Sequence, residues 1–233
     1  MRIKRIIVVI FLLLIIKANA QQSKPNIIYI LCDDLGIGDI KTYNPQGKIA
    51  TPNVDKMAAD GIKFTDAHSS SSVCTPSRYS IMTGRYNWRS VLQSSVLVSY
   101  SKPLIEDTTY TQPQMLKENG YKTACIGKWH LGMTWSTKSG GYSNDTTSES
   151  DIDFSGPIRN TPVHYGFDYY FGIAASLDMS PYLYIENDRA TNPKTEAVPG
   201  DKAMHYRKGV KASDFDFYKT LETLSAKADN YIT

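Results

Sequence analysis

Two stretches of the sequence carry residue types that can act together on an anion. The first, C-T-P-S-R at residues 74–78, places the thiol of Cys74 just before an expected helix and Arg78 one turn into it. Helix N-termini attract anions, and a guanidinium can hold them through paired hydrogen bonds. The second, G-K-W-H-L-G at residues 127–132, supplies Lys128 and His130. A cation and an imidazole near one nucleophile can serve as an anion clamp and a proton shuttle.

Asp33 and Asp34 form a further candidate site. They follow the apolar run at residues 26–31, which we expect to be a buried parallel strand. In α/β folds, ligands bind at the carboxyl ends of such strands. Two hard oxygen donors suit Ca²⁺ or Mg²⁺ better than zinc. An Asp-Asp pair considered alone is more often a solvated turn, so the assignment depends on the wider pattern.

The elements that must position these residues alternate between strands and helices. We predict strands over three short runs, at residues 26–31, 62–67 and 122–126, and an aromatic strand or turn at 166–172. We predict helices over residues 51–60, 77–83, 111–119 and 214–232, the second capped by Thr75. Polar composition indicates surface loops at residues 138–153 and 187–212. This order predicts an α/β fold with a mostly parallel sheet sandwiched by helices.

The first twenty residues have the pattern of a signal peptide. Basic residues at positions 2, 4 and 5 precede an apolar run at 6–16, and A-N-A at 18–20 is a cleavage site. We expect export to the periplasm or medium after cleavage near Ala20, and no stable membrane span. An uncleaved anchor is the alternative, disfavoured by the short run. Cleavage lowers the 26 basic residues to 22, against 23 acidic ones, so charge gives no support to a nucleic-acid partner.

The three cysteines differ in their surroundings. Cys32 and Cys125 lie in apolar runs, and we expect them to pack as small hydrophobic residues without forming a disulfide. Cys74 follows the polar S-S-S-S-V segment at residues 69–73. A plain thiol is unusual there, which fits a cysteine that is converted to another group.

In their order along the chain, these motifs resemble those of the type I sulfatases, in the alkaline-phosphatase-like superfamily. The C-x-P-x-R stretch resembles the sulfatase signature whose cysteine is oxidised to formylglycine. P-N-I-I at 25–28 with D-D-L-G at 33–36 resembles the N-terminal metal motif, and G-K-W-H-L-G at 127–132 is the third match. The resemblance implies a sulfatase-like fold for residues 21–233 and hydrolysis of sulfate esters. It also implies maturation by a formylglycine-generating enzyme or an anaerobic sulfatase-maturating enzyme.

The resemblance assigns a role to each matching residue. Cys74, as a hydrated aldehyde, would offer one hydroxyl to attack sulfur and a second to expel the sulfate. The maturation enzyme would read Arg78, whose guanidinium can also hold the sulfate or the aldehyde hydrate. Lys128 would contact the sulfate, and His130 would contact the formylglycine hydroxyl. Ser176 lies where some sulfatases present a serine to the substrate, although leucine follows it here instead of the histidine often found.

The metal site and the length of the chain follow from the same resemblance. Asp33, Asp34 and the residue derived from Cys74 would bind Ca²⁺, with Mg²⁺ possible. A later histidine, an Asp-Asn pair and a second lysine of the family pattern are not found before Thr233. We therefore expect these residues to be the N-terminal portion of a longer sulfatase, truncated at the C-terminus and poorly active alone.

Three functions stay open at this point. The first is a sulfatase acting on sulfated carbohydrate, the abundant extracellular sulfate ester, or on an aryl sulfate. The second is a phosphate or phosphonate ester hydrolase of the same fold. The third is an inactive glycan-binding fragment, for which Cys74 would stay unmodified.

Overall fold

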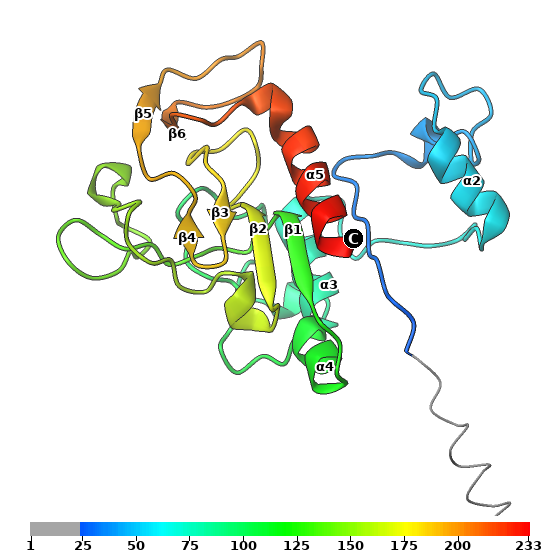
Figure 1. Ribbon diagram of the computed structural model, residues 1–233, viewed down its shortest axis with the longest axis horizontal. Coiled ribbons are helices and arrows are strands. Elements are labelled where there is room, and N and C mark those ends of the chain that lie inside the picture. Colours follow the sequence, from blue (N-terminus) through cyan, green and yellow to red (C-terminus); the bar gives the residue numbers. More distant parts are fainter. Residues whose placement is uncertain (1–23) are drawn as a thin grey trace, which may run out of the picture. The chain divides into compact units, whose positions relative to one another are not determined.

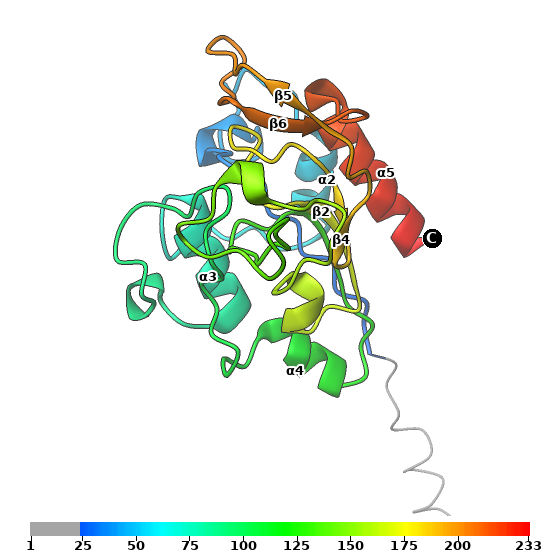
Figure 2. The same cartoon turned by 90° about the vertical axis from the view of Figure 1, so that its left-hand side faces the viewer.

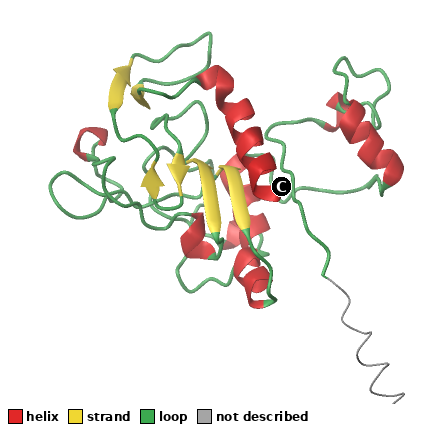
Figure 3. Ribbon diagram, viewed as in Figure 1, coloured by secondary structure: helices red, strands yellow, loops and turns green. Residues whose placement is uncertain are grey.

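The computed structural model describes residues 24–233 (Figures 1 and 3). The expected signal peptide at residues 1–20 lies outside the described residues. The chain forms two compact units, which over the described residues comprise 24–55 and 56–233. Across residues 24–233, every helix is too short or too polar to cross a membrane.

The first unit has little regular structure. It contains a 3₁₀ turn at Ile37–Asp39 and the start of helix α2 (Pro52–Asp60), which has the predicted bounds within one residue. The run at residues 26–31 is extended but joins no sheet, and Ile28 is 63% exposed. A buried parallel strand needs ladder partners beside it and helices over its faces. Within residues 24–55 this run has no ladder partner and forms no strand, which differs from the prediction, and Cys32 is likewise exposed instead of packed.

The second unit contains a four-stranded sheet. Its strands are β1 (Ala124–Lys128), β2 (Tyr169–Ile173), β3 (Ile185–Glu186) and β4 (Arg189–Ala190), in that spatial order. β1 and β2 are parallel, whereas β3 and β4 add as antiparallel strands (Figure 1). The α/β class is therefore as predicted, and within the described residues the sheet is mixed. The predicted strand at 62–67 is exposed coil, because it too pairs with no other strand there.

Three helices accompany this sheet: α3 (Cys74–Thr83), α4 (Gln112–Glu118) and α5 (Thr220–Ile232). α4 agrees with its prediction, since Thr111 and a glutamine three residues later form a capping box. α5 begins six residues later than predicted, because the Asp216 side chain caps a separate 3₁₀ turn just before it. α5 contacts β1 and β2, where Tyr231 stacks on Tyr169 with ring centroids 5.5 Å apart.

The predicted loop at residues 187–212 contains regular structure. Besides β4, it holds β5 (Thr195–Val198) and β6 (Gly209–Ala212), which pair antiparallel (Figure 2). Pro199 and Gly200 lie in the connection between these two strands, whereas Pro193 precedes β5 and Gly209 begins β6. Short strands of this kind depend on each other for hydrogen bonds and carry a weak local signal. The prediction for residues 187–212 is therefore wrong in part.

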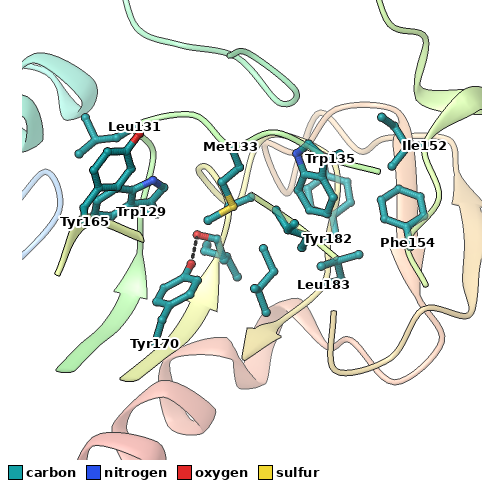
Figure 4. Close-up of a cluster of buried hydrophobic side chains, with 14 of the residues drawn as sticks. Trp129, Leu131, Met133, Trp135, Ile152, Phe154, Tyr165, Tyr170, Tyr182 and Leu183 are labelled. Carbon is teal, nitrogen blue, oxygen red and sulfur yellow. Dashed lines mark hydrogen bonds between the residues drawn. The ribbon is translucent and has the colours of Figure 1, made fainter. Parts of the chain in front are cut away.

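The core lies beside the end of β1. Beyond the strand, the apolar side chains of Trp129, Leu131, Met133 and Trp135 are each at most 2% exposed, and His130 among them is buried as well (Figure 4). Tyr170 of β2 packs in the same cluster and donates a hydrogen bond to the carbonyl of Ile173, 3.0 Å away. This burial fixes the path of the chain that carries Lys128 and His130.

Gly172 allows β1 and β2 to approach each other closely. A Cβ at this position would lie 1.8 Å from the carbonyl oxygen of Gly127, its partner in the parallel ladder. We expect Gly172→Ala to lower the free energy of unfolding by at least about 3 kcal/mol, measured by urea denaturation, because neither backbone can yield without breaking the ladder. Gly140→Ala is the control: Gly140 has φ +83° but open space around it, so backbone strain alone should cost about 1–2 kcal/mol. Equal losses in both variants would contradict the close-approach argument.

Candidate active site

Cys74 is the first residue of α3 and is half-buried. The helix begins three residues earlier than predicted, with Val73 in the N-cap position and the Thr75 hydroxyl directed to other partners. The thiol therefore lies at the amino end of a ten-residue helix, where backbone N–H groups and the helix dipole favour negative charge. Cys74 therefore begins the helix, whereas the prediction placed it three residues before the first helical residue.

Lys128, the last residue of β1, joins three parts of the second unit. Its ammonium Nζ lies 3.1 Å from the Sγ atom of Cys74 and 3.3 Å from the Oγ atom of Ser176. Ser176 follows β2, the parallel neighbour of β1, so both residues leave the sheet at the same edge. A lysine ammonium at this place is a point charge that can serve an anion bound beside the thiol.

Arg78 supports this arrangement from within α3. Its Nη1 atom donates a hydrogen bond to the backbone carbonyl of Lys128, which holds the end of β1 against the helix. The positive charge of Arg78 also acts on the Cys125 thiol, where it favours the deprotonated form. Burial raises the pKa of the Cys125 thiol to about 12, with the Arg78 charge opposing that rise. Cys125 is thus a neutral, packed thiol outside any disulfide, as predicted.

His130 is buried below the same edge and is 1% exposed. Its Nε2 atom lies 2.8 Å from the carbonyl oxygen of Leu97, and its Nδ1 atom is buried without a hydrogen-bond partner. Burial is the main reason that the pKa of His130 falls to about 4, and the charges of Lys128 and Arg78 lower it further. The imidazole is therefore neutral near pH 7. A neutral ring can accept a proton, as a proton shuttle must.

The low pKa of His130 predicts a pH-dependent stability. In the unfolded chain, histidine binds a proton below its usual pKa of about 6.5, whereas folded His130 does so only near pH 4. Because the unfolded state binds more protons in this window, the free energy of unfolding should fall as the pH drops from 6.5 to 4, by about 3 kcal/mol. The measurement is urea denaturation against pH for the wild type and His130→Gln. Removing His130 should abolish this component, and His164→Gln, at an exposed histidine paired with Asp107, should retain it. Identical pH curves for the wild type and His130→Gln would refute the prediction.

The two candidate metal ligands outside this unit are Asp33 and Asp34. They lie in an exposed turn of the first unit, and Asp34 has φ +55°. Within residues 56–233, no three His, Cys, Asp or Glu side chains gather into a group that could hold a metal. Paired carboxylates are suitable donors for Ca²⁺ or Mg²⁺, which take six or more oxygens. The donor chemistry of Asp33 and Asp34 therefore fits a hard cation as part of a larger ligand set.

Sequence reasoning missed two participants in the site. Thr75 was interpreted as a helix cap, yet its Oγ1 atom donates to the carbonyl of His130 at 3.0 Å. Leu97 had no sequence signal, because it contributes only backbone groups, whose position depends on the fold. His68 lies outside the site and pairs with Asp66 on the surface.

The fold and the site together define an α/β protein in which Lys128 and Ser176, at one edge of the sheet, lie beside a cysteine at a helix N-terminus. The family model named Sulfatase matches residues 25–230, and the chain belongs to the sulfatase family. Its fold is accordingly the alkaline-phosphatase-like fold of the sulfatases.

Two curated relatives agree with this assignment. The chain is 41% identical over 172 residues to N-acetylgalactosamine-6-O-sulfatase of Bacteroides thetaiotaomicron, covering 73% of this chain and 31% of the relative. It is 40% identical over 172 residues to human steryl-sulfatase, covering 70% and 26%. The chain thus spans about a third or less of the length of these relatives.

Solved structures share this fold. One, from work on glycosaminoglycan metabolism by Bacteroides thetaiotaomicron, has a TM-score of 0.73 and 30% identity, covering 91% of this chain and 48% of that chain. The structure of Ps i-CgsB has a TM-score of 0.62 over 90% of this chain and 41% of that chain. At 23% identity, that second likeness shows the fold alone.

Proposed function

We propose that this chain carries the nucleophile-bearing part of an exported sulfatase that hydrolyses sulfate esters, with Cys74 converted to formylglycine. The observation that carries the proposal is the position of the Lys128 ammonium, 3.1 Å from Cys74 Sγ at the amino end of α3. A cation and a helix N-terminus directed at one residue suit a reaction that develops negative charge there. Neither feature would be needed around a cysteine that only packs in a core.

Each neighbouring residue has a task in this reaction. Asp33 and Asp34 would hold a divalent cation, which when bound would supply positive charge to neutralise a sulfate. The hydrated aldehyde supplies a hydroxyl for attack on sulfur and a second hydroxyl for release of the sulfate. Lys128, with Ser176 on its other side, holds a sulfate oxygen beside that hydroxyl.

Of the remaining two residues, Arg78 positions Lys128 and His130 accepts a proton. Arg78 holds Lys128 in place through the Lys128 carbonyl, and its charge adds to the attraction for an anion. His130 is neutral because burial lowers its pKa to about 4, so it can accept a proton from a neighbouring hydroxyl at neutral pH. Both tasks follow from contacts within the second unit.

Sulfated carbohydrate is the proposed substrate class. Support comes from the 41% identical relative, named for removal of a 6-O-sulfate from N-acetylgalactosamine, and from the structure from glycosaminoglycan metabolism. The signal-like pattern at residues 1–20 supports a role outside the cytoplasm, where such glycans occur. A formylglycine-generating or anaerobic sulfatase-maturating enzyme is the required partner.

The mass of the tryptic peptide from Phe64 to Arg78 tests the proposal. It should be isolated from protein made in a host that matures other sulfatases. An aldehyde in place of the Cys74 thiol is expected, detectable as a mass loss and by reaction with a carbonyl-specific hydrazide. An unmodified thiol in that host would overturn the formylglycine assignment and favour the non-catalytic alternative.

A further inference from the structure

Thr75, Leu97 and His130 form a closed set of hydrogen bonds beneath the candidate site. Thr75 Oγ1 donates to the His130 carbonyl at 3.0 Å and accepts from the Leu97 N–H at 3.2 Å. The Leu97 carbonyl lies 2.8 Å from His130 Nε2. Three segments that are 22 to 55 residues apart in sequence are thereby tied to one another.

The chemistry of the three groups assigns the hydrogen on the imidazole. A backbone carbonyl can only accept, so Nε2 of His130 must carry the hydrogen that joins it to Leu97. In the neutral ring, Nδ1 then presents a lone pair. That atom is buried and has no partner in the protein, which is costly unless a donor arrives from a ligand or a modified residue.

The Thr75 hydroxyl binds the backbone of both His130 and Leu97. It uses its one hydrogen on His130 and accepts one from Leu97, so both backbone polar groups of Leu97 are bound. His130 has φ +56°, a conformation that a non-glycine residue keeps only when its surroundings hold it. The bond from Thr75 to the His130 carbonyl is one such restraint.

We propose that Thr75 is a positioning residue that, through Leu97, holds His130 as the Nε2–H tautomer with Nδ1 free to accept. Nδ1 would receive a hydrogen bond from a hydroxyl of the hydrated residue derived from Cys74, a step that rests on the proposed function. The role of Thr75 itself concerns only the tautomer of the His130 imidazole.

Nitrogen-15 NMR of the 233-residue chain tests this directly. The chain has four histidines, and His130→Gln identifies the signal of His130. We expect a single Nε2–H tautomer in the wild type, with an Nε2–H proton that exchanges slowly with water. Thr75→Val, which keeps the shape but removes the hydroxyl, should speed that exchange about tenfold or more. Thr75→Ser, which keeps the hydroxyl, should restore the wild-type behaviour.

Thr111→Val is the matched control. Like Thr75, Thr111 is buried, lies at a helix start and donates from Oγ1 to a backbone carbonyl, here that of Tyr165. Its loss should leave the His130 signal unchanged. An Nδ1–H tautomer in the wild type would overturn the proposal even if Thr75→Val failed to fold. Unchanged exchange in a folded Thr75→Val would do so as well. The measurement needs no conversion of Cys74, so its failure is distinct from failure of the proposed function.

Discussion

Replacing Cys74 with alanine is expected to lower the turnover of sulfate esters by at least about 10⁴-fold, because the nucleophile is lost while the clamp residues stay. The helix should persist, since Cys74 is half-buried and contributes no cap to α3. The measurement is the rate of sulfate release by protein from a host that matures sulfatases. Cys125→Ala is the matched control, because that thiol is packed and neutral. Retained turnover in Cys74→Ala would exclude Cys74 as the nucleophile.

Cys74→Ser separates formylglycine chemistry from simple nucleophilic catalysis. A serine hydroxyl can accept the sulfuryl group but lacks the second hydroxyl that expels it. We therefore expect release of about one equivalent of alcohol per enzyme and then arrest, seen as a burst in a chromogenic sulfate assay. Steady turnover by this variant would show that the aldehyde is dispensable.

Replacing Lys128 with methionine is expected to lower kcat/KM by about 10²–10³-fold, the usual cost of removing one charge-stabilising donor. Lys128 lies at the end of β1, and its ammonium contacts both Cys74 and Ser176, so the substitution removes the positive charge from between them. Methionine keeps the length and the apolar stem while it removes the charge. The measurement is kcat/KM for a sulfate ester, together with the melting temperature.

Lys227→Met is the control for the loss of a lysine charge. Lys227 lies on α5, 3.2 Å from Glu186 and 4.4 Å from the ring centroid of Phe171. These two contacts involve none of the candidate site residues, so kcat/KM should stay within about twofold of the wild type. Stability should fall only slightly, because a partly exposed ion pair contributes little. Equal losses of activity in the two variants would contradict a specific role for Lys128.

Strong local signals account for what the sequence determined. The capping residues of α4, the aromatic run at β2 and the motif at residues 74–78 each act within a few neighbours, so they could be identified without the fold. The candidate site residues Cys74, Arg78, Lys128 and His130 were identified from such motifs. The same stretches indicated the sulfatase family, and the family model confirms that the chain belongs to it.

Long-range contacts account for what only the tertiary structure decided. Strand formation at residues 26–31 depends on ladder partners, and the pairing of β5 with β6 depends on their mutual hydrogen bonds. Helix α3 begins at Cys74, earlier than predicted, and the Thr75 hydroxyl does not cap it. That hydroxyl instead donates to the carbonyl of His130, 55 residues away. Leu97 contributes to the site only through its backbone, whose N–H and carbonyl are the same in every residue but proline. Side-chain type therefore revealed which residues can do chemistry, and only the fold could show which backbone groups hold them.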